Sequence, residues 1–209
     1  MLRRIKQVLS DLGFHKDDVE ILSQDIFETY TSVGRNYHDI NHILNMLNNF
    51  DEFMRCSESA QKIKNVNEFM FAIIMHDYVH GNANDVDDSI KKAKEFLYKV
   101  SARYNCDYVA TLIKATDYDK CEDVDFDGQL MQDLDLQTLG AVDTEYDKYA
   151  NQIRQEYLQY SDDIFYAERV KILNVFLNRM YIFNTEYYRN KYEQAARNNI
   201  ARELSKITN

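Results

Sequence analysis

Apolar residues along this chain recur at the three- and four-residue spacing that is typical of amphipathic helices. The first two apolar stripes lie on either side of Gly13 and comprise Ile5, Val8, Leu9, Leu12, Val19, Leu22, Ile26 and Tyr30. Residues at this spacing share one helix face and become buried together when the helix packs. The pattern therefore predicts two helices within residues 1–31.

The same periodicity predicts helices along the rest of the chain. An apolar stripe at 43–50 predicts a helix with His42 at its beginning. The segment Phe69–Met75 is apolar on every side, which predicts a helix buried all round that ends at His76 and Asp77. Further helices are expected at about 89–100, with Ser89 as the cap, and at about 105–116, 128–140, 143–159, 164–183 and 185–206.

Composition supports a wholly helical architecture. The 209 residues include no proline and five glycines, so the chain has few of the residues that punctuate the turns of β and α/β folds. Hydrophobic residues make up 45% and charged residues 29%, which is typical of a globular protein with its own core. We predict an all-α fold with one compact domain over 1–209, divided into N-terminal helices at 1–30, a core at 31–140 and C-terminal helices at 141–209.

The charge and the cysteines exclude several classes of protein. A formal net charge of −10 provides no broad positive field for a nucleic-acid backbone or an anionic membrane, so we expect no stable DNA or RNA binding. Cys56, Cys106 and Cys121 form no C-x-x-C pair, which indicates free thiols in a reducing cytoplasm. No apolar run reaches the roughly eighteen residues of a membrane span. We expect a cytoplasmic protein without a membrane partner.

Four of the five histidines form two pairs at i,i+4 spacing, His38 with His42 and His76 with His80. On a helix this spacing puts both rings on one face, which suits shared coordination of a metal, although one histidine of each pair can equally be exposed or hydrogen-bonded. The doublet His76-Asp77 is more specific, because ionisable groups at the end of a buried element need compensation. Either a divalent cation of the Mn, Fe, Co, Zn or Mg type or local backbone hydrogen bonds could provide it.

These residues, taken together, resemble the HD superfamily and, within it, a branch of predicted metal-dependent phosphohydrolases. The resemblance covers most of the chain from about residue 30 and rests on R-x-Y-H-x-x-x-H at 35–42, the apolar run into His76-Asp77, Asp133-Leu-Asp-Leu, Leu139-Gly140, Tyr146, Tyr149, Arg154, Glu156, Tyr157, Arg169, Arg179 and 197–199. It implies an HD-domain-like helical bundle in which His42, His76, Asp77 and Asp135 hold the metal.

The choice of Asp135 over Asp133 also has a physical argument. Residues two apart on a helix point about 200° apart, so only one of them can face a given metal. Asp135 shares its face with Met131 and Leu139, whereas Asp133 shares its face with glutamines four residues before and after it. We therefore expect Asp133 to lie on a solvated face or behind the metal ligands.

Phosphoryl chemistry also needs an acid and positive charge. Asp87, which belongs to an acidic cluster after the doublet, is the candidate general acid that protonates the leaving oxygen, unless the cluster is simply a solvated helix start. Arg35 and His38 are the candidates for neutralising developing charge. Arg35, Tyr37 and Arg154 are the candidate substrate-binding residues, because phosphate recognition favours arginine and a base can stack on an aromatic ring.

The sequence departs from the family pattern after Ala115-Thr116, where relatives tend to carry a histidine at the position of Asp119, so the number of metals stays open. The predicted function is hydrolysis of a small phosphorylated metabolite of nucleotide type by a metal-activated water. The alternative is a nucleotide-binding or interaction protein that keeps the metal site with little turnover. A third hypothesis is a zinc hydrolase with His38 and His42 as direct ligands. A homo-oligomer is compatible with each.

Overall fold

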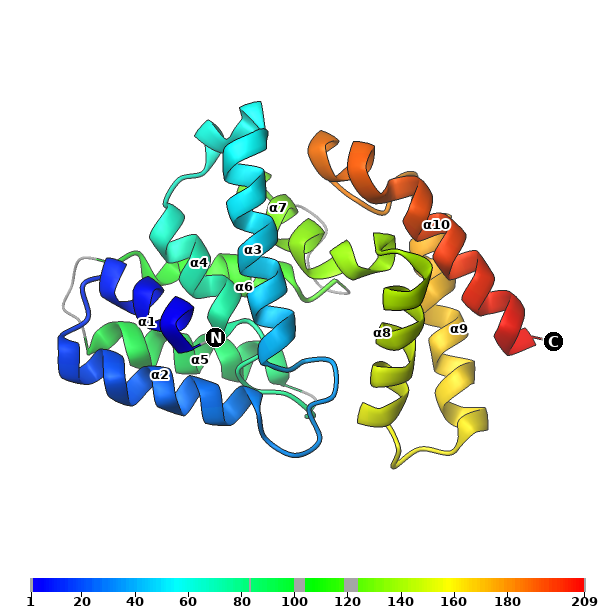
Figure 1. The fold of residues 1–209 in the computed structure, drawn as a ribbon, viewed down its shortest axis with the longest axis horizontal. Coiled ribbons are helices and arrows are strands. Elements are labelled where there is room, and N and C mark those ends of the chain that lie inside the picture. Colours follow the sequence, from blue (N-terminus) through cyan, green and yellow to red (C-terminus); the bar gives the residue numbers. More distant parts are fainter. Residues whose placement is uncertain (1, 83, 100–103, 119–123, 209) are drawn as a thin grey trace. The chain divides into compact units, whose positions relative to one another are not determined.

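The computed structural model describes residues 2–82, 84–99, 104–118 and 124–208 (Figure 1). These residues form ten α-helices, two short 3₁₀ helices and no strand, so the prediction of an all-α fold is confirmed. The elements are α1 (Leu2–Asp11), α2 (Lys16–Tyr30), α3 (Ile40–Cys56), η1 (Glu58–Lys62), α4 (Val66–Met75), α5 (Asp85–Tyr98), α6 (Cys106–Ala115), α7 (Phe126–Leu136), η2 (Gln137–Gly140), α8 (Asp143–Glu156), α9 (Asp162–Asn178) and α10 (Glu186–Thr208).

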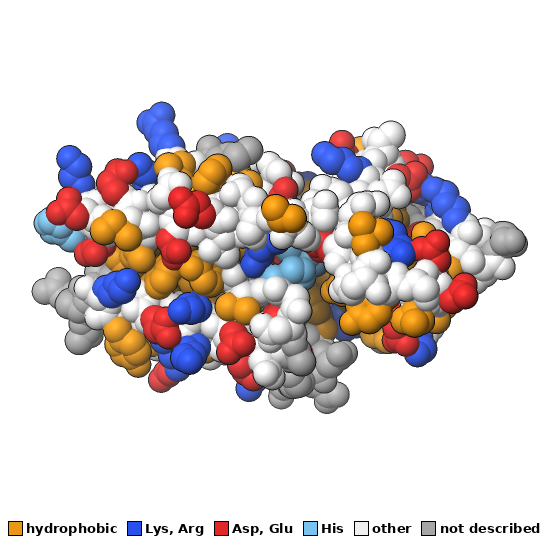
Figure 2. Space-filling model, turned by 90° about the horizontal axis from the view of Figure 1, so that it is seen from below, with side chains coloured by type: hydrophobic (Ala, Val, Ile, Leu, Met, Phe, Trp, Pro, Cys, Tyr) orange, Lys and Arg blue, Asp and Glu red, His pale blue; other side chains and the backbone are white. Residues whose placement is uncertain are grey.

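The chain divides into two compact units, Met1–Met131 and Gln132–Asn209, with the boundary inside α7. The C-terminal part expected at 141–209 falls within the second unit. Whether the two units act as one domain, as the sequence predicts, stays a prediction. Among the described helices, none combines the length and the apolar character that crossing a membrane requires. Acidic and basic side chains are interspersed on the face drawn in Figure 2.

Helix α4 is the centre of the first unit. It contacts α1, α3, α5 and α6 and is buried from Glu68 to Met75, as its uninterrupted apolar sequence predicts. Asn65 caps its N-terminus by accepting a hydrogen bond from the Glu68 N–H. The rings of Phe50 on α3 and Phe69 on α4 stack with centroids 4.6 Å apart. Because α4 is enclosed on all sides, the residues at its C-terminal end are held in a rigid setting.

Several helix boundaries differ from the sequence prediction, including the start of α5 and the end of α9. Helix α5 begins at Asp85, four residues before Ser89, so Ser89 does not cap it. The Ser89 side chain is buried, and its hydroxyl oxygen accepts a hydrogen bond from the Val79 N–H at 3.0 Å. The helix expected to end near residue 183 also ends earlier, because α9 stops at Asn178.

The second unit packs α8, α9 and α10 with η2. A Cβ added at Gly140 would lie 2.5 Å from the Cβ of Tyr192, so only glycine permits the close approach of η2 to α10. Arg169 of α9 forms a buried ion pair with Glu203 of α10, with Nε 2.8 Å from Oε1. Tyr146 of α8 donates a hydrogen bond to Glu203 at 2.6 Å, so three helices meet at one polar cluster.

Asp133 is fully buried, so of its two expected placements the solvated face is wrong, while the placement behind the metal ligands stays a prediction. Its carboxylate accepts hydrogen bonds from the N–H groups of Asn184 and Thr185 and from the Thr185 hydroxyl, at 2.6 to 2.7 Å. Burial raises the pKa of Asp133 to about 6, although these hydrogen bonds oppose the shift. Asp133 therefore fastens the segment before α10, within the second unit, to α7.

Candidate metal centre

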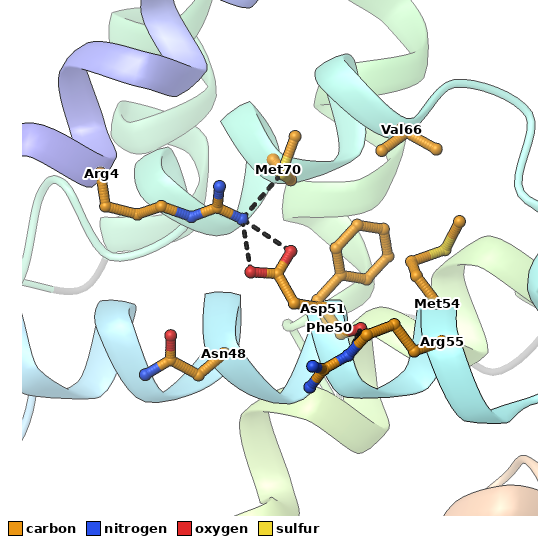
Figure 3. A pocket seen from close by; sticks show the side chains of 8 residues that line it. All are labelled: Arg4, Asn48, Phe50, Asp51, Met54, Arg55, Val66 and Met70. Carbon is orange, nitrogen blue, oxygen red and sulfur yellow. Dashed lines mark hydrogen bonds and ion pairs between the residues drawn. The ribbon is translucent and has the colours of Figure 1, made fainter.

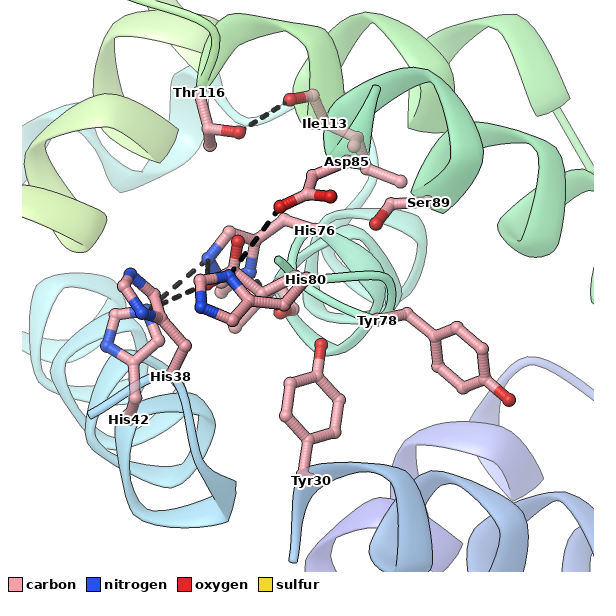
Figure 4. A network of polar contacts seen from close by, with 12 residues as sticks. Tyr30, His38, His42, His76, Tyr78, His80, Asp85, Ser89, Ile113 and Thr116 are labelled. Carbon is pink, nitrogen blue, oxygen red and sulfur yellow. Dashed lines mark hydrogen bonds and ion pairs between the residues drawn. The ribbon is translucent and has the colours of Figure 1, made fainter. Parts of the chain in front are cut away.

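Three side chains of the first unit direct one donor atom each toward a common point. His76 Nε2 lies 3.0 Å from Asp77 Oδ2 and 3.3 Å from His42 Nε2, and His42 Nε2 lies 3.7 Å from Asp77 Oδ2. His42 comes from the first turn of α3, while His76 follows the last residue of α4 (Figure 4). Asp77 is the next residue in the chain. The predicted ligands His42, His76 and Asp77 are thus brought together.

Contacts outside the donor group orient the His76 ring and hold the backbone of His42. His76 Nδ1 lies 2.9 Å from the Ile73 carbonyl oxygen, and because a carbonyl can only accept, Nδ1 carries the proton. In a neutral ring, Nε2 then holds the lone pair that faces the other two donors. Asp39 caps α3 by accepting hydrogen bonds from the N–H groups of Asn41 and His42. This cap fixes the start of α3 and with it the backbone of His42.

The dimensions of the donor group fit a divalent cation. A point equidistant from the three donor atoms lies about 2 Å from each, which is the length of a bond from zinc or a similar ion to an imidazole nitrogen or carboxylate oxygen. His42 and His76 are buried, whereas the Asp77 side chain is 20% exposed. Mixed nitrogen and oxygen ligands suit divalent ions of first-row transition metals such as Mn, Fe, Co and Zn.

The backbone that follows α4 is held by Arg35. Its Nη1 donates hydrogen bonds to the carbonyls of His38 at 2.9 Å and Asp77 at 2.8 Å, and its Nη2 donates to the Tyr78 carbonyl at 2.8 Å. The guanidinium also lies over the ring of Tyr30, 4.8 Å from its centroid. Arg35 therefore joins the segment before α3, the helix that carries His42, to the segment after α4, which contains His76 and Asp77.

Two tyrosines support the same region. The hydroxyl of Tyr30 donates a hydrogen bond to the carbonyl of Ile74 in the last turn of α4 at 2.7 Å, and burial raises the Tyr30 pKa well above its ordinary value. The hydroxyl of Tyr78 donates to Asp25 on α2 at 2.7 Å. Burial, reinforced by this carboxylate, raises the pKa of Tyr78 to about 12. Both tyrosines therefore stay neutral hydrogen-bond donors at physiological pH.

A second group of imidazoles lies beside the donor group. The rings of His38 and His80 are 4.3 Å apart at their centroids, and the ring of Tyr37 lies 5.0 Å from His38. His80 Nδ1 is 3.8 Å from an oxygen of Asp85, whose carboxylate also accepts hydrogen bonds from the N–H groups of the loop at 81–82. Asp85 is therefore the acid of the 85–88 cluster that lies beside a histidine.

The other predicted site residues lie as follows. Asp87 is exposed on the first turn of α5. Asp135 is half-buried on α7, and Arg154 of α8 donates hydrogen bonds to Asp162 and to the carbonyls of Tyr157 and Tyr160; both residues belong to the second unit. Their roles as general acid, metal ligand and substrate-binding residue stay predictions. Asp119 and Cys121 lie outside the described residues.

Sequence reasoning missed Asp39 and Tyr30 as supporting residues, and it included Asp85 only as a member of the acidic cluster in which Asp87 was preferred. Asp39 had a readable signal, because an aspartate directly before an apolar helical stripe is a common N-cap. The role of Tyr30 depends on a contact made by the tertiary fold, and the role of Asp85 depends on the geometry of the loop at 81–82. No local sequence pattern predicts either role.

A groove of about 610 Å³ lies elsewhere in the first unit, among α1, α3 and α4 (Figure 3). Phe50, Met54 and Met70 contribute apolar surface. Arg4 Nη2 lies 2.6 Å from Asp51 Oδ1, so these two charges on the groove neutralise each other. The donor group does not line this groove.

Comparison of the chain with protein-family models, with curated proteins and with solved structures gave no match.

Proposed function

We propose that this protein is a metal-dependent phosphohydrolase of the HD type, which cleaves a phosphate ester or anhydride in a small metabolite of nucleotide type. The observation that carries the proposal is the donor group of His42, His76 and Asp77, with its cation-sized spacing and its oriented His76 ring. The resemblance adds Asp135 as a fourth ligand. We leave the ion open among Mn, Mg, Co, Fe and Zn.

The residues around the donor group have the chemistry that such a reaction needs. A divalent cation held there supplies Lewis-acid stabilisation of charge on a phosphoryl oxygen. His38 and His80 present imidazole groups that can donate hydrogen bonds to phosphoryl oxygens or transfer a proton. Arg35 adds fixed positive charge while its N–H groups hold the backbone on both sides of the donor group. Tyr37 offers an aromatic surface next to His38.

The bulk properties favour a small substrate in the cytoplasm. A net charge of −10 disfavours a polyanionic nucleic acid, whereas a small phosphorylated compound needs only a local positive site. Cys56 and Cys106 are free thiols, which suits a reducing compartment. We therefore propose a cytoplasmic enzyme without a membrane partner.

The test is turnover of a panel of nucleotides and phosphoesters, read by release of phosphate or nucleoside, with Mn²⁺, Mg²⁺ or Co²⁺ added. We expect at least one substrate to be hydrolysed by the wild-type chain, and a loss of at least about 10³-fold for Asp77→Ala and Asp77→Asn. Asp17→Ala is the matched control, because Asp17 is exposed on the first turn of α2.

Full activity in Asp77→Asn would refute the proposed site. Tight metal binding with no turnover across the whole panel would instead favour the alternative, a nucleotide-binding protein that retains the metal site. A loss of metal in His38→Ala equal to that in His42→Ala would favour the zinc hydrolase, in which both histidines are ligands.

A further inference from the structure

Helix α9 carries an exposed apolar face in the second unit. Ile164, Ile172 and Val175 are 56%, 50% and 54% exposed, which is unusual for three branched apolar side chains on one helix. The opposite face of α9 is buried and includes Arg169, Leu173 and Phe176. The exposed face is therefore additional to the surface that α9 uses to fold.

The exposed face has the spacing of a coiled-coil seam. Positions 164, 168, 171 and 175 follow each other at intervals of four, three and four residues, which is the a and d spacing of a heptad. Ile164 and Val175 occupy the ends of this seam. Glu168 and Lys171 occupy its centre, where they form an exposed ion pair of 2.6 Å within the helix.

The order of these four residues is symmetric about the middle of the helix. In an antiparallel pair of α9 helices related by a two-fold axis between residues 169 and 170, Glu168 faces the partner's Lys171. In the same pair Ile164 faces the partner's Val175. A parallel pair in register would instead place Glu168 against the partner's Glu168, which is repulsive.

We infer that α9 is a self-association surface on which a second copy of this chain packs its own α9 antiparallel. The segments that flank the helix agree with this arrangement. Leu158 and Tyr160 before α9 and Met180 and Tyr181 after it are exposed by 47% or more. Antiparallel packing brings the leading segment of one chain beside the trailing segment of the other, so apolar side chains meet at both ends as well.

The pairing is weak and depends on concentration. A helix of 17 residues is about 25 Å long, so one helix pair buries less than the roughly 1,200 Å² of a stable interface. The central charges add little affinity, because their desolvation offsets most of their attraction. Their effect is to select the antiparallel register and the partner. The inference is independent of the proposed chemistry, since it uses no residue of the donor group.

The inference is tested by sedimentation equilibrium of the wild-type chain and of two charge-reversal variants. Protein concentrations from about 5 µM to about 500 µM bracket a micromolar dissociation constant. We expect the average mass of the wild-type chain to rise toward that of a dimer. Glu168→Lys places four lysines at the centre of the pair, and Lys171→Glu places four glutamates there. Each reversal weakens association at least about tenfold.

The decisive measurement is sedimentation of an equimolar mixture of Glu168→Lys and Lys171→Glu. A chain with lysine at both positions complements a chain with glutamate at both, so the mixture associates at least as well as the wild type although neither variant does so alone. The controls are Lys92→Glu and Glu95→Lys, which reverse the exposed i,i+3 ion pair on α5 and should leave the mass unchanged. A wild-type chain that stays monomeric throughout, or a mixture that fails to associate, would overturn the inference.

Discussion

Replacing Arg35 distinguishes two roles for this residue, a contact with substrate and support of the metal centre. The sequence predicts the first role, and the contacts of the side chain favour the second. Arg35→Ala removes three hydrogen bonds to the carbonyls of His38, Asp77 and Tyr78 and the contact with the Tyr30 ring. We expect this variant to lose both stability and metal affinity.

The magnitude follows from these contacts. Each of the three hydrogen bonds contributes about 1 kcal/mol at a partly buried site, and the contact with the aromatic ring adds about 0.5 kcal/mol. The free energy of unfolding should therefore fall by about 3 to 4 kcal/mol. The Asp77 carbonyl then loses its hydrogen bond from Arg35, so the backbone of this ligand is no longer held in place. Loss of such support typically weakens metal binding about 10- to 100-fold.

The assay is urea unfolding in the presence of a chelator, which removes any contribution of bound metal, together with a metal titration of the folded protein. Arg35→Lys should recover part of the stability, because one ammonium group cannot reach all three carbonyls. Arg3→Ala is the control, since Arg3 is exposed. If Arg35→Ala lost turnover but kept wild-type stability and metal affinity, the positioning role would be refuted.

Two further perturbations test the packing of the units. Arg169→Met leaves Glu203 buried without its ion-pair partner and should lower the free energy of unfolding by about 3 to 5 kcal/mol in urea titrations. Replacing both Arg169 and Glu203 by apolar residues should lower it by less. Equal losses of stability in the single and the double variant would contradict this expectation. Tyr108→Phe removes a 2.6 Å hydrogen bond to buried Asp127 and should cost about 1 to 3 kcal/mol at neutral pH. Burial raises the pKa of Tyr108, so its stabilising effect is complete below the ordinary tyrosine pKa of about 10 and is lost as the pH rises further. The stability difference between wild type and Tyr108→Phe should therefore narrow above about pH 10, and a constant difference would contradict the assignment.

The helices were predictable because each buries a regular apolar face. The run Phe69–Met75 predicted the buried centre of the first unit, and the doublet at its end predicted two of the three donors. Helix starts were less predictable. Ser89 looked like a cap, but its hydroxyl is used by the Val79 N–H from a preceding loop, and α5 begins four residues earlier.

Residues whose partners are distant in sequence could not be assigned a role from local pattern. Asp133 was expected on a solvated face because its helical neighbours are glutamines, yet its partners at residues 184 and 185 are about fifty positions away. Arg35 suggested phosphate binding by its position next to His38. Its actual partners are backbone carbonyls, which a sequence does not display.

The most direct test of the central claim is the binding of a divalent cation to the chelated protein, measured by equilibrium dialysis with Co²⁺ or Mn²⁺. The account predicts at least one tightly bound ion per chain. It also predicts that His42→Ala, His76→Ala and Asp77→Ala each lower the affinity at least about 100-fold, while His15→Ala, which removes an exposed histidine, binds as the wild type does. A wild-type chain that binds no ion, or three ligand variants that bind it as tightly as His15→Ala, would contradict the assignment of His42, His76 and Asp77 as a metal centre.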